Sequence, residues 1–355
     1  MKNIEKYRKL LPELGLDGVL LTGRVNRRYC AQYDIMEAIA LVTPTESRYF
    51  TDSRYIEAAE KNLPDFTVEM VDKDHSFAML LRKAVEELGI RELGFEEECL
   101  TVSEFSEFDQ ALGVKLVPCQ KHLDALRVVK EDWELERMRK AQRITDQAFS
   151  EILTKIRPGM TEMEVRAELI YCLYKNGADG LAFDPIVVSG PNTSMPHGVP
   201  GERRLQDGDF ITMDFGAAVD GYCSDMTRTV ALGYATEEMK KVYEIVLEAQ
   251  KAGIAAAKAG VPGNAIDGAA RSVIEKAGYG AFFGHGFGHC LGLMIHEPPN
   301  CNPKNDQLMP AGCVTSAEPG IYLPDRFGVR IEDVLILRED GNEDITASPR
   351  ELIIV

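Results

Sequence analysis

The stretch GDFITMDFG, residues 208–216, decides the fold of this chain. Its apolar run is typical of a buried β-strand, and the run ends on an acid, Asp214. A second acid, Asp225, opens another strand-like run, DMTRTVALG, at residues 225–233. Carboxylates are costly inside a hydrophobic sheet unless a cation lies against them. The stretch therefore raises the question of which cation these two acids face.

A second segment repeats the pattern. GCVTSAEPG, residues 312–320, also places five residues between a glycine and an acid, here Glu318, with one residue before the next glycine. Glu332 follows downstream, as Asp225 does in the first copy. We expect two related strand–turn–strand units whose four carboxylates converge if the units pack about a pseudo-twofold axis. Four clustered carboxylates repel one another and take up protons unless a multivalent cation neutralises them. The repeat therefore predicts a metal site, with two ions favoured.

A further ligand is expected from FFGHGFGHCLGLMIHEPP, residues 282–299, which contains His285, His289 and His296. One neutral imidazole and four carboxylates make an oxygen-rich site, which suits Mn, Co, Fe or Zn but differs from a structural cysteine-type zinc site. The eight cysteines form no C-x-x-C pair. They are typical of buried thiols in a reducing compartment.

The length of 355 residues suggests two domains. Residues 1 to about 125 alternate strand and helix patterns, which predicts an α/β domain with a covered sheet. A run of helical spacing begins near residue 126, and we place the boundary near residues 129–132. The prediction is an N-terminal domain at 1–128 and a C-terminal domain at 129–355. Thr161 and Glu164 fit a capping box at the start of a further helix.

The net charge of −17 argues against nucleic acid and anionic membrane surfaces as general partners. No segment approaches the roughly 18 apolar residues of a membrane span. The first 18 residues lack the uninterrupted apolar core of a signal peptide. We therefore expect a cytoplasmic protein that binds neither nucleic acid nor membrane.

Six short motifs follow one another along residues 130–355: PHG (196–198), DFG with the downstream acid (214–225), HGFGH (285–289), HE.P (296–299), EPGIY (318–322) and GVRIED (328–333). Their order and spacing resemble those of the metal-dependent Xaa-Pro peptidases, prolidase and aminopeptidase P, which are relatives of methionine aminopeptidase. In the N-terminal part, TDSRYIEAA (51–59) is also similar to the family.

The resemblance implies a creatinase-like α/β N-terminal domain and an α+β catalytic domain of pita-bread fold with a pseudo-twofold internal repeat. It also implies a homodimer. The implied activity is hydrolysis of the bond between an N-terminal residue and proline, in small peptides with proline at the second position. Two divalent metal ions are the implied cofactors, with Mn favoured over Co, Zn or Fe.

The resemblance also implies a role for each site residue. Asp214 would bind one ion, Asp225 and Glu332 would bridge both, and His289 and Glu318 would complete the shell of the other. Glu318 would also carry a proton to the departing amine.

Four further residues receive roles around these ligands. His197 and His296 would contact the substrate and stabilise the oxyanion. His285 would line the pocket near the substrate's proline, and Arg330 would orient the carboxylates from outside the metal shell.

The sequence leaves the choice between dipeptidase and aminopeptidase open. Prolidases often carry an arginine shortly after HE.P, where this chain has Asn300, so a strict dipeptidase is disfavoured against an aminopeptidase. Lys304 could replace this arginine only as a point charge, because its ammonium group lacks the planar, bidentate fork of a guanidinium.

Two hypotheses of a different kind are a metal-free creatinase-like amidinohydrolase and a non-catalytic binding protein on the same fold. Both predict that metal ligands have been lost. This chain keeps an acid or a histidine at all five expected positions, which favours the metallopeptidase.

Overall fold

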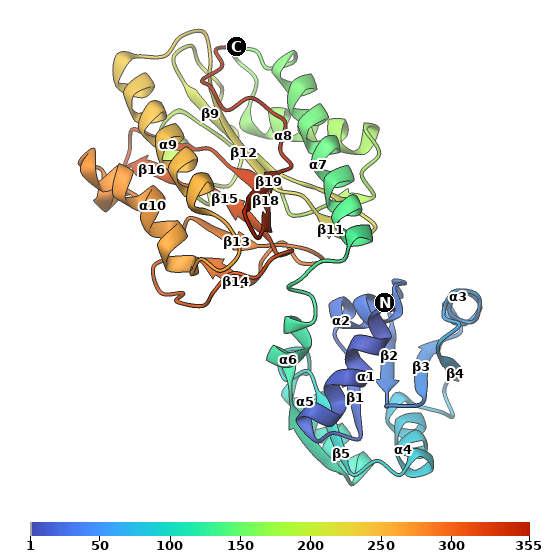
Figure 1. Cartoon of the computed structure of the whole chain (residues 1–355). Coiled ribbons are helices and arrows are strands. Elements are labelled where there is room, and N and C mark those ends of the chain that lie inside the picture. Colours follow the sequence, from blue (N-terminus) through green and yellow to red (C-terminus); the bar gives the residue numbers. More distant parts are fainter. Residues whose placement is uncertain (1) are drawn as a thin grey trace. The chain divides into compact units, whose positions relative to one another are not determined.

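The computed structural model describes residues 2–355 (Figure 1). The chain divides between Arg127 and Val128 into two compact units. None of the helices in the described residues combines the length and the apolar character that a membrane span requires.

The N-terminal unit is built on a six-stranded mixed sheet of order β4-β3-β2-β1-β5-β6. Every residue of β1 and β2 is buried, as expected for a sheet covered on both faces. The predicted α/β domain with a covered sheet is therefore present. Its strands are β1 (Gly18–Leu21), β2 (Ala38–Val42), β3 (Ser47–Asp52), β4 (Thr67–Val71), β5 (Glu92–Phe95) and β6 (Lys115–Pro118). Its helices are α1 (Asn3–Leu14), α2 (Arg24–Ala31), α3 (Ile56–Asn62), α4 (Phe77–Leu88), α5 (Val102–Leu112) and α6 (Gln120–Ala125).

The C-terminal unit contains two helix pairs, each with its own set of strands. Helices α7 (Asp132–Leu153) and α8 (Glu162–Lys175) share one apolar core with strands β8, β9 and β12. Helices α9 (Glu237–Ala256) and α10 (Gly263–Lys276) share a second core with residues of β16, β17 and β18. The predicted capping box between Thr161 and Glu164 starts α8, which confirms that prediction.

The strands of this unit form several small sheets, with a three-stranded sheet β12-β9-β8 and a five-stranded sheet β14-β13-β15-β18-β19 as the two that build the site. The strands and short helices are β7 (Gly180–Leu181), β8 (Ile186–Ser189), η1 (Gly190–Ser194), β9 (Phe210–Phe215), β10 (Ala217–Val219), β11 (Tyr222–Cys223), β12 (Met226–Ala231), η2 (Gly280–Phe282), β13 (Gly288–Cys290), β14 (Glu297–Cys301), β15 (Val314–Ala317), β16 (Gly320–Leu323), β17 (Phe327–Arg330), β18 (Asp333–Arg338) and β19 (Gly341–Asp344).

The two repeated segments fold in the same way. Strand β9 pairs antiparallel with β12, and β15 pairs antiparallel with β18. Asp214 lies at the end of β9 and Asp225 directly precedes β12, while Glu318 directly follows β15 and Glu332 directly precedes β18. We call these two antiparallel pairs, β9 with β12 and β15 with β18, the two ribbons. Each ribbon therefore carries its two acids at the same end, as the repeat predicts.

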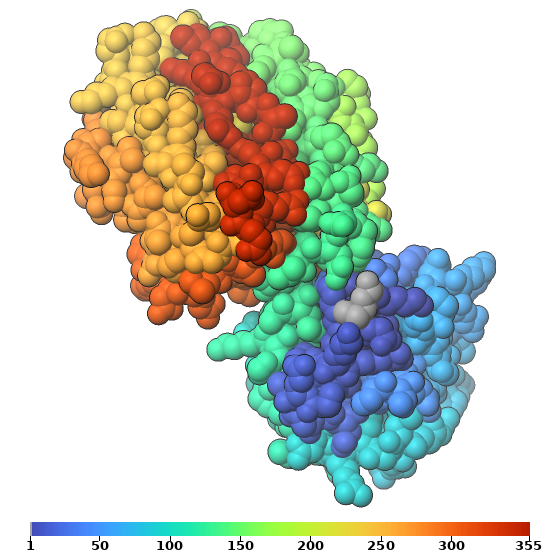
Figure 2. Space-filling model, in the orientation of Figure 1, coloured from blue at the N-terminus to red at the C-terminus, as the bar shows by residue number. Residues whose placement is uncertain are grey.

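The last residues of the chain tie the two halves of this unit together. Figure 2 shows them, in red, on the face between α7 and α9. Asp146 of α7 accepts the backbone N–H of Ser348, and Asn342 donates to the carbonyl of Ile254 in α9. Arg228 of β12 is fully buried and donates to the carbonyls of Ser348 and Glu332. The backbone at Glu332 is thus fixed by the neighbouring ribbon.

Candidate active site

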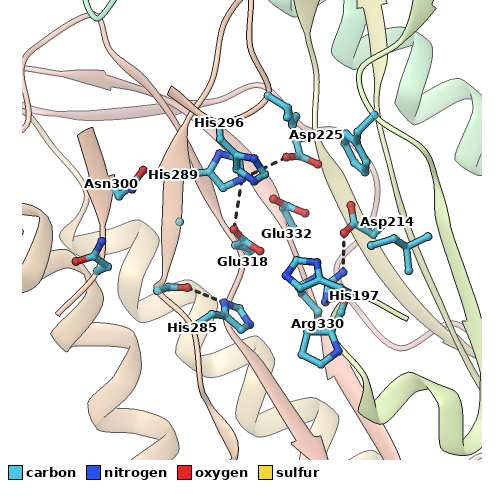
Figure 3. A pocket seen from close by; sticks show the side chains of 17 residues that line it. His197, Asp214, Asp225, His285, His289, His296, Asn300, Glu318, Arg330 and Glu332 are labelled. Atoms are coloured by element: carbon cyan, nitrogen blue, oxygen red, sulfur yellow. Dashed lines mark hydrogen bonds and ion pairs between the residues drawn. The ribbon is translucent and has the colours of Figure 1, made fainter. Parts of the chain in front are cut away.

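A cavity of about 320 Å³ lies in the C-terminal unit where the acid-bearing ends of both ribbons meet (Figure 3). Every residue predicted for the site lines it: Asp214, Asp225, His289, Glu318, Glu332, His197, His285, His296 and Arg330. Asn300 is also part of the wall. Residues separated by more than a hundred positions therefore share one cavity, as the repeat requires.

The five predicted ligands form one cluster. One ligand atom from each of Asp225, His289 and Glu332 lies within 4.8 Å of the other two. The Nε2 atom of His289 is 3.5 Å from Asp225 Oδ2 and 3.5 Å from Glu318 Oε1. Asp214 lies close enough to raise the pKa of both Asp225 and Glu332. A single ion could thus contact side chains from both ribbons.

Two glycines allow this close approach. A Cβ atom at Gly216 would lie 2.0 Å from the carbonyl oxygen of Ser224, and one at Gly288 would lie 2.0 Å from that of Ser316. Real Cβ atoms do not approach a carbonyl oxygen so closely, so only glycine fits at both positions. Gly288 lets the strand that carries His289 pack directly against β15. In the same way, Gly216 lets the chain just after Asp214 pack against Ser224, which directly precedes Asp225.

The carboxylates are not satisfied by the protein alone. Burial raises the pKa of Asp225, and the charges of Asp214 and Glu318 add to the rise. Burial also raises the pKa of Glu332 and of Glu318, with Asp225 adding to the effect on Glu332. Asp214 Oδ1 and Asp225 Oδ1 are buried and accept no hydrogen bond from residues 2–355. The cluster therefore has the chemistry of a site for divalent cations.

His289 is arranged as a neutral ligand. Burial lowers its pKa, so the imidazole is uncharged at neutral pH. Its Nδ1 atom lies 3.1 Å from the carbonyl oxygen of Cys290, which makes Nδ1 the donor. The lone pair is then on Nε2, which faces the carboxylates. This tautomer is the one that metal binding requires.

Arg330 is a buried cation that belongs to the carboxylate cluster. Its Nη2 donates to Asp214 Oδ2 at 2.6 Å, and its Nε donates to Thr227 Oγ1 at 3.0 Å. Thr227 Oγ1 in turn donates to Glu332 Oε2 at 2.7 Å. Arg330 and Thr227 therefore connect an acid of the first ribbon with an acid of the second. The sequence predicts an orienting role for Arg330, and these contacts provide its geometry.

Thr227, Tyr322 and Ser316 also contact residues of the site, and the sequence motifs did not predict these contacts. Ser316 Oγ donates to Glu318 Oε1 at 3.3 Å and accepts the backbone N–H of His289 at 3.1 Å. Thr227 lies two positions after Asp225 on a strand, so side-chain alternation could have placed it on the same face. Tyr322 lies within the EPGIY motif, but nothing in its spacing indicates its partners.

The three histidines other than His289 line the cavity in different ways. Both nitrogens of His285 are engaged within the protein, because Nδ1 lies 2.8 Å from the Gly286 carbonyl and Nε2 lies 2.9 Å from the Tyr322 hydroxyl. His296 lies edge-on to His289, with ring centroids 4.3 Å apart. His197 is exposed on the loop after η1. His197 and His296 are therefore accessible to a substrate, whereas both ring nitrogens of His285 already have partners in the protein.

Two family models match the chain. Residues 136–339 match the metallopeptidase family M24, and residues 3–129 match the creatinase/prolidase N-terminal domain. The chain belongs to metallopeptidase family M24. The predicted family is thereby confirmed, and membership implies that the chain binds divalent metal.

Relatives of this M24 metallopeptidase cover its whole length. An Xaa-Pro dipeptidase of Pyrococcus furiosus is 34% identical over 354 residues, which are 99% of each chain. A solved Xaa-Pro dipeptidase from Bacillus anthracis has a TM-score of 0.97 and 42% identity, and the match covers 100% of this chain and 99% of that one. A solved X-Pro aminopeptidase from Thermotoga maritima MSB8 has a TM-score of 0.93 and 38% identity, covering 99% and 100%. The predicted fold is confirmed by these matches.

Proposed function

We propose that this M24 metallopeptidase is an Xaa-Pro exopeptidase, which removes the N-terminal residue from peptides with proline at the second position. The observation that carries the proposal is the convergence of four carboxylates and the neutral Nε2 of His289 in one cavity. Relatives that are named Xaa-Pro dipeptidase or X-Pro aminopeptidase support the choice of substrate.

We propose two divalent ions as cofactors. Asp214 would hold one ion, His289 and Glu318 would hold the other, and Asp225 and Glu332 would bridge them. The oxygen-rich set favours Mn over Co, Zn and Fe. When bound, the ions supply Lewis acidity, which lowers the pKa of water and polarises the scissile carbonyl. The homodimer and the cytoplasmic location stay predictions of the sequence.

The side chains around the ligands have separate tasks in this proposal. Glu318 would take a proton from the attacking water and deliver it to the proline nitrogen. Ser316 Oγ holds its Oε1, so the carboxylate is fixed in orientation during the transfer. Burial lowers the pKa of His296, so a neutral imidazole N–H would be available to the developing oxyanion. His197 would contact the substrate from the exposed loop.

The test is a panel of short peptides with the metal-reconstituted full chain. We expect kcat/KM for Ala-Pro-Ala to exceed that for Ala-Ala-Ala by about 100-fold, which is the order that shape discrimination in a pocket provides. N-acetylated Ala-Pro-Ala should not be cleaved, because the proposal requires a free N-terminus. Equal cleavage of Ala-Pro-Ala and Ala-Ala-Ala would contradict the proposal.

The hydroxyl of Thr227 should matter for metal binding. Thr227→Val keeps the β-branched shape but removes the hydrogen bonds to Glu332 and from Arg330. Replacing a residue that orients metal ligands typically lowers metal affinity about 10–100-fold. We therefore expect a calorimetric titration to show a loss of Mn affinity of that size in Thr227→Val. Thr227→Ser, which keeps the hydroxyl, should bind closer to wild type. Unchanged affinity in Thr227→Val would contradict this role.

A further inference from the structure

The loop that carries His197 runs from Ser189, the last residue of β8, to Gly201. His197 lies in the cavity wall together with Pro196, which directly precedes it (Figure 3). The side chain of His197 is exposed, so little packing surrounds it. The position of an exposed side chain on a loop depends on the contacts that hold the loop in place.

Glu162, the first residue of α8, holds both ends of this loop. The residue is fully buried. Its Oε1 accepts the backbone N–H of Ser189 at 2.7 Å, the hydroxyl of Ser189 at 2.9 Å and the side-chain amide of Asn192 at 2.9 Å. Its Oε2 accepts the backbone N–H of Gly201 at 3.0 Å. One oxygen therefore binds the start of the loop, and the other oxygen binds its end.

The first turn of α8 contributes its backbone to the same contacts. The N–H of Glu162 donates to the carbonyl of Arg203 at 3.1 Å, and the N–H of Met163 donates to that of Gly201 at 3.2 Å. These N–H groups have no acceptor within the helix itself. The guanidinium of Arg203 in turn donates to the Ser189 hydroxyl at 2.6 Å. The start of α8 thus joins the two ends of the loop.

The middle of the loop is attached to β17, the strand that ends at Arg330. Thr193 Oγ1 accepts the backbone N–H of Gly328 at 2.8 Å. The carbonyl of Pro196 accepts a hydrogen bond from Arg330 Nη1 at 3.2 Å. The tip of the loop is therefore tied to the arginine of the carboxylate cluster, and a shift of the loop ends would move His197 relative to that cluster.

The two oxygens of Glu162 explain why an acid is buried at this position. A buried carboxylate is costly unless hydrogen bonds compensate, and here two backbone N–H groups, a hydroxyl and an amide provide them. A glutamine side chain has one accepting oxygen, and its NH2 group would face N–H donors. Glutamine could therefore bind one end of the loop but not both.

Building on the proposed Xaa-Pro activity, we propose that Glu162 is a positioning residue for the reaction, which holds both ends of the 189–201 loop so that the imidazole of His197 is fixed in the cavity. Glu162 is not one of the described residues that line the cavity, so it acts through this loop. A displacement of about 1 Å in a group that contacts the substrate can cost about 100-fold in rate. The contacts of Glu162 therefore affect catalysis from outside the cavity.

The test is a double-mutant cycle between Glu162→Gln and His197→Ala, with the metal-reconstituted full chain and Ala-Pro-Ala as substrate. We expect Glu162→Gln alone to lower kcat/KM about tenfold or more, because one end of the loop loses its acceptor. His197→Ala alone should lower it by at least as much. In the His197→Ala background, Glu162→Gln should lower kcat/KM by less than about twofold, because no imidazole is left to position.

Three results of this cycle would overturn the proposal. An equal loss from Glu162→Gln with and without the His197 imidazole would mean that the substitution acts through the fold in general. An unchanged kcat/KM in Glu162→Gln would show that the contacts of Glu162 have no effect on the reaction. An unchanged kcat/KM in His197→Ala would remove the group that Glu162 is proposed to position.

Hydrogen exchange tests the anchoring of the loop without a substrate. We expect the backbone amides of Ser189 and Gly201 to exchange faster in Glu162→Gln than in the wild type, at one end of the loop or at both, because an acceptor is lost. Wild-type exchange rates at both ends would overturn the proposal, whatever the chain cleaves. If the wild type cleaves no Xaa-Pro peptide but the loop exchanges faster in the variant, the Xaa-Pro activity is wrong and the anchoring role of Glu162 stands.

Glu164→Gln is the matched control, because it makes the same chemical change two residues further along α8. Glu164 is exposed and accepts the backbone N–H of Thr161 at 2.7 Å, a contact that glutamine can also make in a capping box. We expect wild-type kcat/KM and wild-type loop exchange. Mn affinity should be unchanged in Glu162→Gln too, since none of its hydrogen-bond partners is a predicted ligand. A loss of Mn affinity in Glu162→Gln would overturn the proposal.

Asn192→Ala is a milder variant, which decides the question if Glu162→Gln does not fold. It removes one donor to Glu162 Oε1 and leaves the buried carboxylate in place. We expect kcat/KM to fall about two- to tenfold, the size that the loss of one hydrogen bond produces, and the fall should disappear in the His197→Ala background. An unchanged kcat/KM in Asn192→Ala, or a fall that persists without the imidazole, would overturn the proposal.

Discussion

Replacing Asp225 with asparagine is expected to lower kcat/KM for an Xaa-Pro peptide by more than about 100-fold, since even residues that only orient ligands affect metal sites about 10–100-fold. Asp225 lies with His289 and Glu332 in the group whose ligand atoms are within 4.8 Å of one another. Asparagine has nearly the same shape but cannot bridge two cations as a carboxylate does. The measurement is metal content per chain together with peptidase activity. Two bound ions and near-normal turnover would contradict the bridging role.

The same substitution should stabilise the metal-free protein. Burial raises the pKa of Asp225, with Asp214 and Glu318 adding to the rise, so the charged carboxylate opposes folding at neutral pH. An asparagine side chain at this position carries no charge, and the repulsion would disappear. We therefore expect metal-free Asp225→Asn to unfold at a higher temperature than the metal-free wild type, by roughly 2–4 °C per kcal/mol for a unit of this size. Added Mn should stabilise the wild type more than the variant. A lower melting temperature in the metal-free variant would contradict this electrostatic account.

Replacing Lys130 with methionine should have the largest effect on stability. Lys130 Nζ lies 3.1 Å from Glu297 Oε2, and the two side chains are 1% and 2% exposed. Removal of one partner from a buried ion pair typically costs about 3–5 kcal/mol of unfolding free energy. Glu297 also accepts the backbone N–H of Met294 and directly follows His296, so activity should fall as well. Denaturant unfolding of the metal-free chain measures the loss of stability.

A second substitution distinguishes charge from packing. Lys130→Met with Glu297→Met removes both charges, and we expect it to recover a large part of the loss, because apolar replacements of buried pairs are often neutral. Lys240→Met, which breaks the exposed ion pair with Glu237, should change the unfolding free energy by less than about 1 kcal/mol. A loss of similar size in Lys130→Met and Lys240→Met would contradict the importance of the buried pair.

The sequence predicts that the acids lie at equivalent strand ends, and the structure shows this arrangement, because the repeat is local. Each ribbon is a glycine, a short apolar run and an acid, so the spacing alone places Asp214 and Glu318 at equivalent strand ends. Asp225 and Glu332 follow from the partner strands of the same ribbons. The covered sheet predicted for residues 1 to about 125 also appears, because β1 and β2 are continuous apolar runs, which are typical of a sheet covered on both faces.

Contacts between the ribbons could not be predicted in the same way. Thr227 and Glu332 are separated by 105 positions, and the hydrogen bond between them depends on how the two ribbons pack. Lys130 and Glu297 are 167 positions apart. Neither local pattern nor side-chain periodicity specifies such pairs. Arg330 is occupied by hydrogen bonds to Asp214 and Tyr322, so its positive charge is not free to bind a substrate group. These contacts are likewise visible only in the folded chain.

Anomalous diffraction from crystals of the full chain grown with Mn²⁺ is the most direct test of the central claim. The account predicts two peaks in the cavity: one in contact with Asp214, Asp225 and Glu332, and one in contact with Asp225, His289, Glu318 and Glu332. Peaks that contact none of these side chains, or a cavity without any peak while Xaa-Pro cleavage persists, would contradict it.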